Sequence, residues 1–172
     1  MAVRPDPGLA GRRSHDHRYG DGIVERRVFI HASTRTVWAT LHDPTAMAAV
    51  VPELRLGPAS PSWPAAATTR SAQASLGLLR ERAHVESLEA RPESTFRIRA
   101  TGSGFVGEWS WRLEAVSGGT RVVHAASFEP VDRWTTILVR LGRRSLEARV
   151  EAHLRALKER AERAERSPTS VA

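Results

Sequence analysis

Alternating apolar and polar positions predict a set of antiparallel strands in the middle of the chain. Phe96, Ile98 and Ala100 alternate with polar residues, and the odd positions from Phe105 to Leu113 are apolar again after a glycine-rich connection. A period of two with one apolar face is typical of antiparallel strands that are solvated on one side. The same alternation predicts strands over 23–30, 81–86 and 119–128.

Two segments of this region carry weaker signals. Residues 65–75 are mostly small or threonine and predict a strand only weakly. Residues 57–64 contain Pro58, Pro61 and Pro64, and proline donates no hydrogen bond to a sheet, so we expect a loop or a ragged edge there.

Helical spacing appears at both ends of this run of strands. Ser33 is a candidate N-cap for a short helix, and Asp43 with Pro44 is typical of the start of a second one. A long amphipathic pattern closes the chain, with one apolar stripe before Gly142 and another, differently directed, after it. A break or kink near Gly142 would reconcile the two stripes, and the first half of the helix would then act as a lid. The alternative is that the first half is buried all round or belongs to a separate short helix.

Length and composition indicate one domain. The 172 residues, 41% of them hydrophobic, suffice for a single core. We expect solvated tails over 1–21 and 167–172 around a domain at 22–166. We find neither a secretory signal nor a run of about 18 apolar residues, and therefore predict a cytoplasmic protein without integral membrane association.

The net charge of +7 raises the possibility of nucleic-acid binding. However, Lys158 is the only lysine and asparagine is missing, which indicates a coding bias across the chain, as in a bacterium of high G+C content. Acidic residues are also interleaved with basic ones in the last helix, for example Glu151 before Arg155. A solvated helix face explains most of this charge, and we expect no nucleic-acid partner.

The sequence predicts neither a cofactor nor a metal site. Gly102–Gly107 has the G-x-G-x-x-G spacing of a dinucleotide-binding loop, but the residues after it alternate as a strand does, whereas that motif requires a helix. The chain has no cysteine, and its histidines lack the spacings typical of a closed metal site.

Several segments together resemble the START-like superfamily (SRPBCC), whose bacterial branch is called polyketide cyclase/dehydrase and lipid transport. They are Val24, Val28–Ser33, Val37–Trp38, Gly107–Trp111, Gly119–Val122, Leu154 and Leu157–Lys158. The resemblance spans roughly residues 22 to 166. It implies an α+β fold in which a curved antiparallel sheet grips a long C-terminal helix, with two short helices after the first strand. It also implies an apolar pocket between sheet and helix.

A curved sheet covered by one helix leaves room for an apolar pocket, whatever the family. The residues that we expect to line it are Phe96, Ile98, Trp109, Trp111, Trp134 and Leu138. Ordinary core packing is the alternative for these side chains. His124 is the candidate general acid or base on the inward face, with a satisfied strand histidine as its alternative. Glu81 is a weaker candidate.

Three functions remain open at this point. The first is a module that binds a hydrophobic, lipid- or polyketide-like small molecule. The second is a polyketide cyclase or aromatase/dehydratase in which His124 moves a proton. The third is a binder of nucleic acid or of a membrane surface through the basic last helix.

Overall fold

The computed structural model describes residues 23–58, 62–76, 79–131 and 143–167. Seven strands form one antiparallel sheet in the order β1-β7-β6-β5-β4-β3-β2. The strands are β1 (Ile23–Ile30), β2 (Leu54–Leu56), β3 (Thr69–Leu76), β4 (Leu79–Arg91), β5 (Thr95–Thr101), β6 (Phe105–Val116) and β7 (Gly119–Pro130). The helices are α1 (Thr34–His42), α2 (Pro44–Val50) and α4 (Arg143–Arg166).

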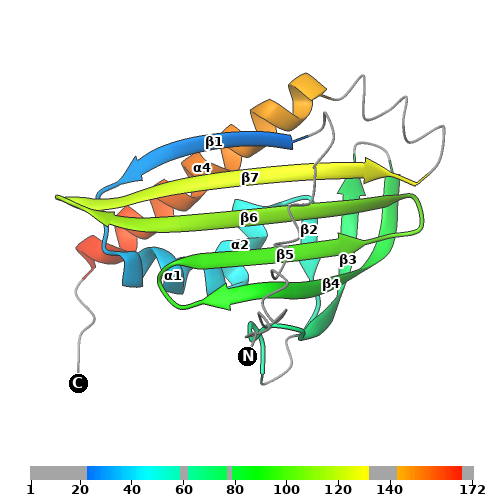
Figure 1. Ribbon diagram of the computed structural model, residues 1–172, viewed down its shortest axis with the longest axis horizontal. Coiled ribbons are helices and arrows are strands. Elements are labelled where there is room, and N and C mark those ends of the chain that lie inside the picture. Colours follow the sequence, from blue (N-terminus) through cyan, green and yellow to red (C-terminus); the bar gives the residue numbers. More distant parts are fainter. Residues whose placement is uncertain (1–22, 59–61, 77–78, 132–142, 168–172) are drawn as a thin grey trace, which may run out of the picture.

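The sheet is strongly curved, and the three helices of the described residues lie on one of its sides. Figure 1 shows β3 crossing steeply against β5, β6 and β7, so the sheet bends around the helices. A shift of register between Ser87 and Glu89 marks an irregularity in the pairing of β4 with β5, of the kind that increases local bending. Helix α4 contacts β1, β7, α1 and α2. The fold is therefore α+β, with a sheet that grips the last helix.

The two short helices begin at the residues that the sequence indicates. The Ser33 side chain accepts a hydrogen bond from the backbone N–H of Thr36, and Asp43 accepts one from Ala46 in the same way. Pro44 occupies the first turn of α2, where its missing N–H costs nothing. These caps turn the chain twice after β1 and bring it back to the sheet at β2.

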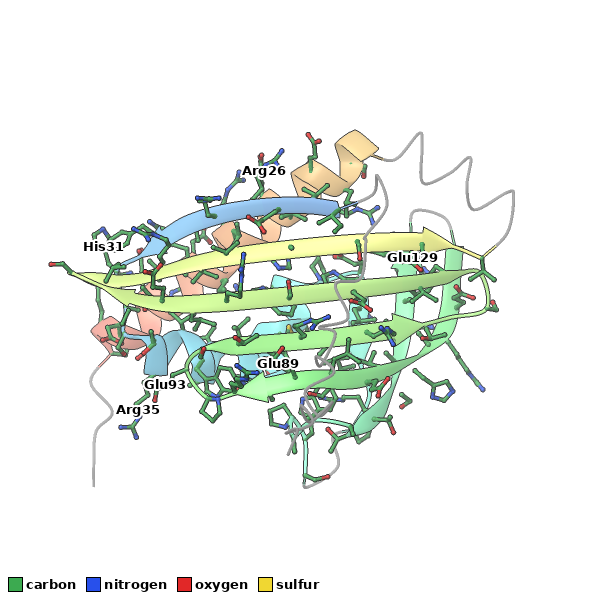
Figure 2. The ribbon with its side chains drawn as sticks, in the orientation of Figure 1. Arg26, His31, Arg35, Glu89, Glu93 and Glu129 are labelled. Atoms are coloured by element: carbon green, nitrogen blue, oxygen red, sulfur yellow. The ribbon has the colours of Figure 1, made fainter. Side chains whose placement is uncertain are left out.

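Helix α4 packs through one apolar stripe and is held at its edge by polar contacts. Val150, Leu154, Leu157 and Ala161 are buried at helical spacing. Arg26 on β1, which lies along the edge facing α4 in Figure 2, forms ion pairs with Glu147 and Glu151. Glu151 thus reaches across to the sheet.

The predicted fold class, with its order of elements, is confirmed. The weak segment at 65–75 contains most of β3, and the residues after Gly104 form strand β6 rather than a helix. The predicted kink near Gly142 and residues 1–21 and 168–172 of the expected tails lie outside the described residues. None of the described helices is long and apolar enough to cross a membrane.

Candidate functional site

The inner face of the sheet carries a layer of aromatic side chains. Phe96 on β5 and Trp111 on β6 stack with ring centroids 5.7 Å apart. Trp109 packs edge-on against Phe128 of β7, with centroids 5.2 Å apart. The four predicted lining residues in the described part of the chain, Phe96, Ile98, Trp109 and Trp111, are each at most 1% exposed. The structure thus brings them together on one buried face.

Both tryptophans of β6 have buried indole N–H groups without an acceptor among the residues described. The atoms are Trp109 Nε1 and Trp111 Nε1. A buried donor without a partner costs about 1–3 kcal/mol. The layer therefore presents two N–H donors that no described residue accepts from.

His124 lies on the same inner face, fully buried on β7. Its ring stacks on Trp111, with centroids 4.6 Å apart and planes 5° from parallel. Its Nδ1 lies 2.9 Å from the carbonyl oxygen of Ser110, and its Nε2 lies 3.1 Å from Nδ1 of His153 on α4. Both ring nitrogens of His124 are thus paired within the protein.

His153 extends this contact to a carboxylate. Its Nε2 lies 2.8 Å from Oε1 of Glu53, which precedes β2. This is the distance of an ion pair, although the two atoms are not aligned as a hydrogen bond requires. His153 is 1% exposed and Glu53 8%. Glu53, His153 and His124 form a buried chain that joins the start of β2 to α4 and β7.

The donors and acceptors of this chain can be assigned from its ends. A carbonyl oxygen only accepts, so His124 carries its proton on Nδ1 and accepts at Nε2. His153 must then donate from Nδ1. The remaining ring nitrogen, Nε2 of His153, is the atom that faces the Glu53 carboxylate.

Burial keeps His124 neutral. Removal from water lowers the pKa of His124 to about 3; the Ser110 carbonyl opposes this shift and His153 adds to it. A neutral imidazole with both nitrogens paired has no free position for a ligand. A substrate would contact His124 only after displacing His153.

A second group of rings continues the aromatic layer towards α1. His42 lies 4.6 Å from Phe96 between ring centroids, and Trp63 meets Phe96 edge-on at 6.3 Å. His42 Nδ1 lies 2.7 Å from the Trp38 carbonyl oxygen, whereas its buried Nε2 has no partner among the described residues. Burial lowers the pKa of His42.

Some residues selected from the sequence lie elsewhere or outside the description. Trp134 and Leu138 are outside the described residues. The Glu81 carboxylate accepts hydrogen bonds from Ser103 and from the backbone of Gly104, so it orders the connection between β5 and β6. Among the described residues, no three or more His, Cys, Asp or Glu side chains are arranged so that together they could hold a metal ion.

Sequence reasoning missed Glu53 and His153. His153 stands next to Leu154 within the apolar stripe of α4, and a histidine on such a stripe needs a buried partner. That signal was present in the sequence. Glu53 gave none, because it lies between the end of α2 and β2, where no periodicity applies.

A curved antiparallel sheet wrapped around a long C-terminal helix defines the START-like, helix-grip class of proteins (SRPBCC). Residues 22–162 match the family model "Polyketide cyclase / dehydrase and lipid transport". Because this match spans most of the chain, the protein belongs to that family.

Solved structures of low sequence identity share the fold. The chain is similar to the Zhui aromatase/cyclase from Streptomyces sp. R1128, with 19% identity, a TM-score of 0.62, and coverage of 87% of this chain and 98% of that one. It is also similar to TTHA0849 from Thermus thermophilus, with 20% identity, a TM-score of 0.63, and coverage of 83% and 98%. A conserved protein from Geobacillus kaustophilus gives 13% identity, a TM-score of 0.66, and coverage of 83% and 96%. No curated protein matches the chain.

Proposed function

We propose that this protein binds an apolar small molecule, lipid- or polyketide-like, between the inner face of its sheet and helix α4. The observation that carries this proposal is the pair of buried indole N–H groups in the aromatic layer, which have no acceptor among the described residues. A carbonyl or hydroxyl oxygen of the ligand would accept hydrogen bonds from these two groups. The apolar body of the ligand would pack on the aromatic rings in place of contacts that the rings now make with one another. Pockets for such ligands combine apolar walls with a few placed polar groups.

The family and the fold support the same proposal. The matching family is described by lipid transport as well as by polyketide cyclisation and dehydration. A structural neighbour, the Zhui protein, is an aromatase/cyclase. Both point to apolar ligands, and binding is the property that the two activities have in common.

Native mass spectrometry tests this proposal. The purified protein is incubated with fatty acids, sterols and aromatic polyketides, and its mass is compared under gentle and denaturing conditions. We expect an adduct that denaturation releases. A Trp109→Phe, Trp111→Phe double variant keeps the rings but removes both donors, and we expect it to bind oxygen-bearing ligands more weakly. A wild-type protein that retains no member of the panel would contradict the proposal.

Catalysis of a cyclisation or dehydration is the second candidate, favoured by the chain of Glu53, His153 and His124. In this version His124 exchanges a proton with the substrate once the helix-side contact to His153 opens. His124→Gln should then abolish turnover of a polyketide-like chain while sparing its binding. Unchanged turnover would remove His124 from the mechanism.

A further inference from the structure

Arg70 is a cation placed on the covered side of the sheet. It belongs to β3, and its side chain shares the inward face with the buried residues Ala72 and Ala74. It is only 7% exposed. Burying a charge is costly unless the charge is paired, so the partners of this guanidinium decide what it does.

The guanidinium of Arg70 has neutral partners and an unused donor. Its Nη2 donates to the carbonyl oxygen of Gly57, and its Cζ lies 5.0 Å from the ring centroid of Trp63. Its Nε is buried and has no hydrogen-bond partner, and no ion pair among the described residues includes Arg70. Within the described part of the chain, the positive charge of Arg70 has no ionic partner and its Nε–H group has no acceptor.

The surroundings of Arg70 connect it to the aromatic layer. Trp63, the ring beside the guanidinium, meets Phe96 edge-on. Across the sheet, Arg70 pairs in register with Val85, which pairs with Ala100, which pairs with Gly107. The side chains in this row decrease in size away from Arg70. The cation therefore stands at the end of an apolar surface formed by small residues and rings.

Other charged side chains near this face already have partners. Glu81, four residues before Val85 on the same face of β4, accepts from Ser103 and Gly104. Arg26 at the opposite edge pairs with Glu147 and Glu151. A single positive charge without an ionic partner among the described residues matches a singly charged anion better than a phosphate monoester, which carries about 1.5 to 2 negative charges at neutral pH.

We propose that Arg70 binds the carboxylate of the apolar ligand, so that the protein selects apolar acids over neutral molecules of the same shape. This inference rests on the proposed function and names the ligand class of that site. A guanidinium offers N–H donors in a planar fork that matches a carboxylate. The ligand body then extends from Trp63 towards Phe96 and the tryptophans of β6.

Two pairs of matched probes test this inference. Dodecanoate is compared with dodecanol, and 2-naphthoate with 2-naphthol, by titration at neutral pH. We expect the wild-type protein to bind at least one acid about tenfold or more tightly than its alcohol, since a hydrogen bond to a charged group contributes on that order. Arg70→Gln should remove this preference. Arg70→Lys keeps the positive charge but lacks the planar pair of N–H donors, so it should retain only part of the preference for the acid.

Arg55→Gln is the matched control. Arg55 is exposed on the neighbouring strand β2, opposite Gln73, and its loss should leave the preference unchanged. Near-ultraviolet circular dichroism checks that each variant is folded. If Arg70→Gln is not folded, the comparison is made with Arg70→Lys instead. Equal affinities for acid and alcohol in the wild type would overturn the role of Arg70 while leaving the proposed function intact. If the wild-type protein bound none of the four probes, the result would count against the role of Arg70 and also against the proposed function.

Discussion

His124 on β7 and His153 on α4 meet inside the protein, with 3.1 Å between Nε2 of the first ring and Nδ1 of the second. A hydrogen bond, and not apolar packing alone, therefore joins the sheet to helix α4. Because the Ser110 carbonyl fixes the tautomer of His124, the direction of the hydrogen bond is also fixed, with His153 as donor. Glu53 completes the chain at its other end.

Removing the carboxylate of Glu53 should destabilise the fold. In Glu53→Ala, the buried Nε2 of His153 loses the carboxylate oxygen that lies 2.8 Å away and is left among apolar neighbours, so the free energy of unfolding should fall by about 1–3 kcal/mol. Glu53→Gln should cost less, because it keeps a polar side chain of the same size beside His153 Nε2. Urea unfolding followed by circular dichroism measures both values.

Glu114→Ala is the control for this comparison. Glu114 forms a surface ion pair with Arg121, and such pairs contribute less than about 1 kcal/mol. If Glu53→Ala unfolded at the same urea concentration as the wild type, the buried chain would have no part in stability.

The stability of the protein should decrease in acid because of His124. The pKa of this ring is lowered to about 3 in the folded protein, whereas an unfolded histidine titrates near 6.5. Between these values only the unfolded chain binds the proton, so the contribution is present above pH 6.5 and is lost as the pH falls. The slope for one such group approaches about 1.4 kcal/mol per pH unit.

Urea unfolding at a series of pH values between about 4 and 8 measures this slope. His124→Gln should flatten it, while His84→Gln, at an exposed position of β4, should leave it unchanged. Parallel curves for His124→Gln and the wild type would show that His124 is not the group responsible.

Gly107 should not tolerate a side chain. A methyl group there would lie 2.8 Å from Cη2 of Trp109, closer than packed carbon atoms approach, and 3.1 Å from Cε1 of Phe128, which is tighter than most such contacts. Gly107→Ala should therefore displace these rings and cost about 1–3 kcal/mol of unfolding free energy. Urea unfolding and the tryptophan emission maximum measure the effect.

Ser110→Ala on the same strand provides the comparison. Residue 110 faces away from the layer, and only its carbonyl oxygen is used by His124. We expect wild-type stability and emission for Ser110→Ala. Indistinguishable behaviour of Gly107→Ala would mean that the packing of Trp109 and Phe128 is looser than described.

The sequence predicted the fold where local pattern and tertiary environment agree. In β5 and β6 apolar residues recur at every second position, and most of them are large, so the alternation identifies one buried face. In β3 the inward positions are Arg70, Ala72 and Ala74, which contrast little with their outward neighbours, and the signal was correspondingly weak. A period of two identifies a buried strand face only where the buried residues are clearly more apolar than their neighbours. A buried face of small or charged residues is therefore not detected.

The polar part of the site could not be predicted for a different reason. His124 was recognised as an inward residue because it shares a strand face with Val122 and Ala126. Its partners His153 and Glu53 come from distant parts of the chain and are brought together only when α4 docks on the sheet. The position of His153 on the apolar stripe of α4 indicates that it has a buried partner but does not identify that partner, and Glu53 lies where no periodicity applies.

The indole region of a ¹H–¹⁵N correlation spectrum tests the central claim of ligand binding most directly. Resonances of Trp109 and Trp111 are assigned from Trp109→Phe and Trp111→Phe, and spectra are compared with and without a ligand retained in mass spectrometry, or with the matched probes. We predict that these two N–H resonances move downfield as a ligand oxygen accepts from them. Saturating ligand that leaves both resonances unmoved would contradict binding at the inner face of the sheet.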